Sequence, residues 1–222
     1  MTGTGRLLGS GRSADVYEID DAWVLRRDRD GWGDAAAEAD VMAYVGRHGY
    51  PVPRVRPSGS RTDLVLERLS GPTLLGALAA GRTGTAEAGA LLARLLRELH
   101  AVPGRNAARP EARVLHLDLH RDNVMLTADG PRVIDWSNTE DGHPGLDWGM
   151  SAVILAQVAV GGEAFAGPAR ELLTALLADP SGVTEAGLAE ALRRRSANPT
   201  MSRREVALLP AAEKLVRGLV FS

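Results

Sequence analysis

The sequence contains no cysteine and, among its 26 basic residues, only one lysine, Lys214. Without cysteine the chain forms no disulfide, no thiolate metal site and no cysteine nucleophile. The other 25 basic residues are all arginines. No lysine therefore lies in the first 213 residues.

Strong charge and long apolar runs are also missing. A net charge of −2 favours neither nucleic acid nor an anionic membrane as a partner. Apolar runs such as residues 151–160 are too short to cross a bilayer, and residues 1–6 lack the apolar core of a signal peptide. We therefore expect a cytoplasmic protein without nucleic-acid or membrane partners, whose oligomeric state the sequence leaves open.

What is present is typical of a soluble globular chain, with 45% hydrophobic and 24% charged residues. Its 222 residues can bury a substantial core, as one large domain or as two small lobes. Short apolar segments and turns before residue 70 predict strands, and residues 35–47 carry apolar positions at helical spacing. The strands are expected at residues 6–8, 16–19, 23–27, 54–56 and 63–67.

Beyond Gly71-Pro72 the helical period dominates. Helices are expected at residues 73–80, 87–100, 146–160, 164–178, 185–195 and 206–220. The pattern predicts an α+β protein with one boundary near Ser70. That boundary gives an N-terminal part of residues 1–70 and a C-terminal part of residues 71–222.

The most informative segment is residues 116–135, which reads His-x-Asp-x-x-x-x-Asn, then a hairpin, then Ile-Asp-Trp. Asp118 and Asn123 stand five residues apart on one loop, and Asp135 follows the next strand. Two carboxylates and an amide in this order can hold Mg²⁺ and direct a hydroxyl at a phosphate. Taken singly, Asn123 is compatible with a turn and Asp135 with a strand end; their spacing favours a joint role.

This segment resembles the catalytic loop and metal-binding aspartate of the protein-kinase-like fold, in the form found in aminoglycoside phosphotransferases and choline kinases. The resemblance implies a bilobal fold with an N-lobe antiparallel sheet, one N-lobe helix and a mainly helical C-lobe. It implies that Asp118 orients or deprotonates the acceptor hydroxyl and that Asn123 and Asp135 bind Mg²⁺. His116 is expected to pack beneath the loop, and Asp147 to brace it through backbone N–H groups.

A histidine metal cluster is a weaker interpretation of the same segment. Strand alternation would put His116, Asp118 and His120 on one side, but the supporting groups expected around a histidine site are missing.

The resemblance also implies that residues 1–70 form the nucleotide-binding lobe. Gly9, Ser10 and Gly11 would form a loop over the phosphates of ATP, although Ala14 stands at the third glycine. On the strand of residues 23–27, Val24 would contact the adenine. Arg26 would take the place of the phosphate-binding lysine.

Two further roles follow from the resemblance. Glu38, on the helix of residues 35–47, is the expected ion-pair partner of Arg26. Glu67 and Leu69 lie in the segment that resembles the hinge, whose backbone would hydrogen-bond the adenine.

Only twelve residues separate Asp135 from Asp147, which is too few for the peptide-binding segment of a protein kinase. We therefore expect an ATP- and Mg²⁺-dependent O-phosphotransferase acting on a hydroxyl of a small molecule of aminoglycoside, choline, sugar or amino-alcohol type. Glu140, Asp141 and His143 could recognise an amine, whereas the net positive charge of residues 180–222 disfavours a polycation. The alternative is a pseudokinase-like protein that binds a nucleotide or a partner without turnover, suggested by Arg26 and Ala14.

Overall fold

The computed structural model describes residues 5–11, 13–31, 33–106, 108–162 and 164–221. They group into two compact units. The first unit is Met1–Gly71 together with Met125–Thr139, and the second is Pro72–Val124 together with Glu140–Ser222. The sequence predicted a single boundary near Ser70. The structure has a boundary after Gly71, and it also groups the hairpin after residue 124 with the first unit.

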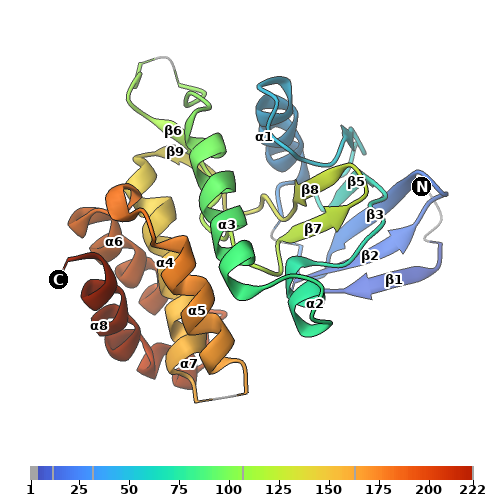
Figure 1. The fold of residues 1–222 in the computed structure, drawn as a ribbon. Helices are drawn as coiled ribbons and strands as arrows, with labels where there is room; N and C mark the ends of the chain where they lie inside the picture. The colour runs from blue at the N-terminus through green and yellow to red at the C-terminus, as the bar shows by residue number, and fades with distance from the viewer. Residues whose placement is uncertain (1–4, 12, 32, 107, 163, 222) are drawn as a thin grey trace. The chain divides into compact units, whose positions relative to one another are not determined.

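The first unit is built on a five-stranded antiparallel sheet in the order β1-β2-β3-β5-β4 (Figure 1). Tight polar turns set its register. For example, the Asp20 carboxylate accepts the backbone N–H groups of Ala22 and Trp23, each at 2.8 Å. The strands are β1 (Leu7–Ser10), β2 (Ala14–Glu18), β3 (Trp23–Asp28), β4 (Val55–Arg56) and β5 (Asp63–Glu67).

One helix, α1 (Ala35–Arg47), accompanies this sheet and contacts β4 and β5. Asp34 caps it by accepting the backbone N–H of Ala37, and its buried face carries Val41 and Val45. The hairpin of β7 (Val124–Thr127) and β8 (Gly130–Val133) completes the unit.

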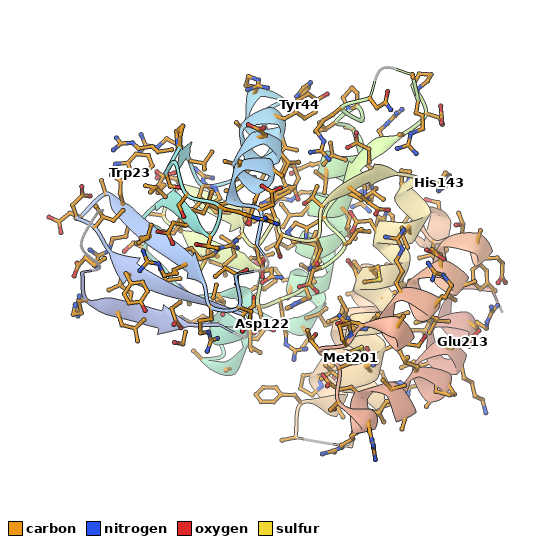
Figure 2. All side chains as sticks on the ribbon, turned by 180° about the vertical axis from the view of Figure 1, so that it is seen from behind. Trp23, Tyr44, Asp122, His143, Met201 and Glu213 are labelled. Atoms are coloured by element: carbon orange, nitrogen blue, oxygen red, sulfur yellow. The ribbon has the colours of Figure 1, made fainter. Side chains whose placement is uncertain are left out.

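Two further contacts lie within the first unit. The guanidinium of Arg56 lies 3.5 Å from the ring centroid of Trp23, the residue labelled at the sheet in Figure 2. Gly71, at φ 140°, lies against the backbone of Leu126, where a Cβ would collide with the Leu126 carbonyl oxygen.

The second unit is mainly helical. Its helices are α2 (Leu74–Ala79), α3 (Thr85–His100), α4 (Pro144–Val160), α5 (Ala166–Leu176), α6 (Glu185–Ala197), α7 (Arg203–Ala207) and α8 (Leu209–Val220), with a 3₁₀ turn, η1 (Pro180–Gly182). The helix α4 is central, since it packs against α5, α6 and α8 (Figure 1). A short antiparallel pair, β6 (Arg113–Leu115) with β9 (Glu140–Gly142), lies at one end.

Small residues allow the close packing around α4. A Cβ at Gly149 would lie 2.8 Å from the carbonyl oxygen of Gly187 on α6, so this crossing depends on glycine. Within the described residues, no helix is long and apolar enough to span a membrane.

The predicted α+β class and most predicted elements are confirmed, and α1 has the predicted bounds. Two predictions about segments were wrong. The helix expected at residues 206–220 is broken at Leu208, because Pro210 has no N–H to continue α7. Strand alternation was expected through residue 120, but β6 ends at Leu115 and Leu117 has φ 63°.

Candidate active site

The loop of residues 116–123 is held from below by the carboxylate of Asp147. Its two oxygens accept the backbone N–H groups of His116 at 2.9 Å and Leu117 at 2.8 Å. The imidazole Nε2 of His100, at the end of α3, lies 3.1 Å from the same carboxylate. Asp147 is fully buried, so these polar contacts take the place of water.

These contacts also set the charge of Asp147. Burial by itself would raise the pKa of Asp147, but the contact with His100, the charge of His116 and the backbone hydrogen bond lower it below its usual value. Asp147 lies in the first turn of α4 and does not cap it. The cap is His143, labelled in Figure 2, which accepts the backbone N–H of Gly145.

His116 has the structural position that the resemblance implies. Its side chain is fully buried, and its Nδ1 lies 3.2 Å from the backbone N–H of Asp118. The strand alternation expected through His116, Asp118 and His120 is wrong, because the backbone turns at Leu117 rather than continuing as a strand. Among the residues that the structure describes, no three His, Cys, Asp or Glu side chains form a metal-binding group.

Asp118 and Asn123 contact each other directly. The amide Nδ2 of Asn123 donates to the backbone carbonyl of Asp118 at 2.9 Å and to its carboxylate Oδ2 at 3.2 Å. Asn123 is 8% exposed, whereas the Asp118 side chain is 26% exposed. In the described part of the chain, nothing donates to Oδ1 of Asn123, so this oxygen remains available as a ligand.

His120 is a site residue that the sequence reasoning left without a role. Its Nε2 lies 3.6 Å from Asp118 and its Nδ1 lies 3.3 Å from Asp122, the loop residue labelled in Figure 2. Burial lowers the pKa of His120, but the contacts with these two carboxylates outweigh it and raise the pKa to about 9. Its spacing of two residues from each aspartate was the available signal.

The protonated His120 in turn affects Asp118. Burial would raise the pKa of Asp118, but the contact with His120 and the charges of His116 and Arg195 lower it below its usual value. The loop therefore presents an ionised, partly exposed carboxylate at neutral pH. That is the form needed to orient a hydroxyl and accept its proton.

In the first unit, Arg26 joins two carboxylates. Its guanidinium is ion-paired with Glu38, as the sequence predicted, and its other terminal nitrogen lies 3.4 Å from Oδ1 of Asp135. Register places Arg26 beside Val24 on one face of β3, and Val24 is 8% exposed. The ion pair thus joins Arg26 on β3 to Glu38 on α1.

Glu38 is nearly buried, at 6% exposed, and its second oxygen accepts the backbone N–H of Trp136 at 3.1 Å. Burial raises the pKa of Glu38 and the charge of Asp135 adds to the rise, while Arg26 opposes both. Because Trp136 directly follows Asp135, this bond ties α1 to the chain that carries the second aspartate.

Asp135 adopts a left-handed backbone, with φ 64°. Its Oδ1 accepts the hydroxyl of Ser137 at 2.8 Å in addition to the Arg26 contact. Its side chain is 40% exposed, and Oδ2 has no hydrogen-bond donor among the described residues. Asp135 therefore offers a free carboxylate oxygen, a ligand type that suits Mg²⁺.

The expected phosphate loop is the β1–β2 turn. Gly9 and Ser10 end β1, and the N–H of Gly11 donates to the carbonyl of Ala14 at 2.8 Å. The Ser10 hydroxyl donates to Asp15 at 2.5 Å. A Cβ at Gly9 would meet nothing within 4 Å, so packing within the described chain does not require glycine there.

The expected hinge follows β5. Glu67 is committed to Arg54, accepting its backbone N–H at 3.0 Å and pairing with its guanidinium at 3.1 Å. Leu69 is half-buried, and its backbone N–H has no hydrogen-bond acceptor in the part of the chain that is described.

Three groups that the sequence suggested for amine recognition are engaged within the second unit. Asp141 accepts the backbone N–H of Arg105 at 2.6 Å, Glu140 pairs with Arg194 at 3.0 Å, and His143 caps α4. Each of the two acidic side chains on β9 thus already has an arginine partner.

A family model described as the phosphotransferase enzyme family matches residues 4–113 and 105–190. The chain belongs to this family. Among curated proteins, none matches the sequence. The match covers Asp118, Asn123, Asp135 and Asp147, so all four lie within the family's own region.

Solved structures similar to this phosphotransferase family member share its fold at low sequence identity. The aminoglycoside phosphotransferase APH(2'')-Ib, ADP-bound, is 14% identical with a TM-score of 0.55, over 95% of this chain and 93% of that one. The streptomycin–ATP–APH(2")-IIa ternary complex is 14% identical with a TM-score of 0.54, over 98% and 90%. The amicoumacin kinase hAmiN, in complex with AMP-PNP, Ca2+ and Ami, is 13% identical with a TM-score of 0.52, over 98% and 89%.

Proposed function

We propose that the protein is an ATP- and Mg²⁺-dependent O-phosphotransferase that acts on a hydroxyl of a small molecule. The observation that carries the proposal is the pairing of Asp118 with Asn123. One group is an ionised carboxylate, and the other is an amide oriented so that its oxygen remains available. Membership of the phosphotransferase family, and the nucleotides named with its structural neighbours, support a nucleotide donor.

The residues divide the chemistry in the following way. Asp118 orients the acceptor hydroxyl and receives its proton, while Oδ1 of Asn123 and Oδ2 of Asp135 are the oxygens that would hold Mg²⁺. Bound Mg²⁺ would neutralise charge on the phosphates. Arg26 is suited to hold phosphate oxygens, because its guanidinium donates in a planar fork.

The remaining expected roles belong to the same proposal. Gly9, Ser10 and Gly11 would approach the phosphates through backbone N–H groups. Val24, together with the backbone at Glu67 and Leu69, would contact the adenine. An unpartnered N–H at Leu69 and an open position at Gly9 support these roles, because a ligand would use both.

The acceptor is proposed to be a small hydroxylated molecule. Asp147 follows Asp135 by only twelve positions, which include β9 and the start of α4, and this leaves no room for a peptide platform. Since Glu140 and Asp141 are engaged by arginines, sugar-like and other neutral acceptors are favoured over polycationic ones.

The test is phosphate transfer from radiolabelled ATP or GTP, with Mg²⁺, to a panel of aminoglycosides, choline, sugars and amino alcohols. For an accepted substrate, Asp118→Asn should lower kcat by about 10²–10⁴-fold, the usual contribution of a positioned general base. The matched control is Asp129→Asn, an exposed aspartate in the β7–β8 turn, which should leave kcat unchanged. Transfer that survives Asp118→Asn would refute the assigned role.

The alternative is a protein that binds nucleotide without turnover. It is favoured by the Arg26 network, because both Glu38 and Asp135 already hold the guanidinium. It predicts that ATP with Mg²⁺ raises the melting temperature while no acceptor is phosphorylated, and that Asp118→Asn leaves this rise intact.

A further inference from the structure

A pocket of about 260 Å³ lies within the second unit, among α2, the start of α3 and the start of α5. Its walls are largely apolar: Leu75 and Leu78 come from α2, and Phe165 and Leu172 come from α5 and the residue before it. The charged group in this wall is Arg121, which stands between His120 and Asp122 in the candidate catalytic loop. We call this cavity the Arg121 pocket.

The Arg121 guanidinium has one buried nitrogen without a hydrogen-bond acceptor. Its side chain is 15% exposed, and its Nε has neither solvent contact nor an acceptor among the described residues. The nearest carboxylate is Asp122 at 3.9 Å, beyond hydrogen-bonding distance, and Asp122 lies closer to His120, at 3.3 Å. A buried N–H group in this state is costly, because buried polar groups are normally hydrogen-bonded.

The backbone keeps Arg121 in place. Its carbonyl accepts the N–H of Leu75 at 3.0 Å, which fixes the residue to the start of α2. Arg121 is thus held in the wall of the pocket by its backbone rather than carried on a free surface loop.

The start of α3 adds weak positive character to the rim. Its N-cap is Gly84, which supplies no side-chain acceptor for the first-turn amides. The opposing charge is Glu171, an exposed residue whose carboxylate accepts the Thr85 hydroxyl at 2.7 Å. Arg121 differs from the rim groups in having a buried N–H without a hydrogen-bond acceptor.

We propose that the Arg121 pocket binds a small amphipathic carboxylate, whose charged end hydrogen-bonds the Arg121 guanidinium and whose apolar part packs on Leu75, Leu78 and Phe165. A carboxylate matches the planar fork of arginine and can accept two parallel hydrogen bonds. The cavity is at the small end of ligand pockets, which suits a molecule the size of octanoate. Binding here requires neither ATP nor phosphate transfer.

The experiment is calorimetric titration of the full chain, without nucleotide, using three probes. Octanoate carries both parts of the proposed ligand, octanol lacks the charge and acetate lacks the apolar part. We expect saturable one-to-one binding of octanoate, with octanol and acetate each about tenfold weaker or more. Octanol binding as tightly as octanoate, or no saturable octanoate binding, overturns the proposal.

Variants locate the site. Arg121→Gln should weaken octanoate about tenfold or more and leave octanol unchanged, whereas Phe165→Ala should weaken both probes. The matched control is Arg94→Gln on the exposed face of α3, where the side chain is 55% exposed; it should bind as the wild type does. Unchanged octanoate affinity in a folded Arg121→Gln protein refutes the proposed site. If that variant does not fold, the comparison of the three probes on the wild type still tests the proposal.

Discussion

The hydrogen bonds from the backbone of His116 and Leu117 to Asp147 give a quantitative prediction. In Asp147→Asn the side chain keeps its shape, but only one of its two polar atoms accepts hydrogen bonds. The backbone N–H groups of His116 and Leu117 bind separate oxygens, so one of them would face an NH₂ group. Losing a charge-assisted hydrogen bond and leaving a buried donor unpaired should lower the free energy of unfolding by about 3 kcal/mol or more at neutral pH.

The sign of the pH dependence follows from the lowered pKa of Asp147. The folded state holds the ionised form more strongly than the unfolded state, so the stabilisation is fully present above the unfolded value of 3.8. It is lost as the pH falls through the folded pKa. The difference between wild type and Asp147→Asn should therefore be largest near neutral pH and shrink in acid.

The measurement is chemical denaturation of both proteins at neutral pH and at a series of acidic pH values. Asp40→Asn, at an exposed aspartate on α1, is the control and should change stability by less than about 0.5 kcal/mol. A loss below about 1 kcal/mol for Asp147→Asn, or a difference that grows in acid, would contradict the described hydrogen bonding.

Two other predictions concern the first unit. Arg26→Met leaves Glu38 buried without its cation and should lower the free energy of unfolding by about 3 kcal/mol or more. Adding Glu38→Gln should recover part of this loss. A double-mutant cycle of denaturation experiments measures the coupling between the two residues, and strictly additive effects would contradict the ion pair. Gly71→Ala should cost about 2 kcal/mol or more in thermal unfolding, because φ is 140° and a Cβ meets the Leu126 carbonyl. Gly218→Ala on α8, where a Cβ meets nothing, is its control and should be neutral or stabilising.

Much of the fold could be predicted from local patterns in the sequence. The bounds of α1 were predictable because Asp34 caps the helix and apolar positions recur at helical spacing before it ends. The Arg26–Glu38 pair was predictable from strand register and family resemblance together. In contrast, β6 and β9 have three residues each and pair across a long stretch of chain, so neither has a pattern of its own.

The candidate site was predictable only in part, for a related physical reason. Asp118, Asn123 and Asp135 are recognisable by spacing, which is local. The partner of Asp147 on α3 is His100, 47 residues earlier, and nothing in the helix pattern separates it from an ordinary terminal histidine. The buried Nε of Arg121 is likewise recognisable only in the folded chain, where α2 and α5 form the pocket that Arg121 lines.

The backbone conformation distinguishes the two segments to which we assign the chemistry. Among the described residues other than glycine, only Leu117 and Asp135 have positive φ, at 63° and 64°. Such a backbone costs a residue with a Cβ about 1 kcal/mol or more, and it persists only where surrounding contacts hold it. Asp147 supplies that contact for Leu117 by accepting its N–H, and Glu38 supplies it beside Asp135 by accepting the N–H of Trp136. In each unit a buried carboxylate thus stabilises a strained turn. Next to the turn at Leu117 lies the partly exposed carboxylate of Asp118, and the turn at Asp135 presents its own partly exposed carboxylate.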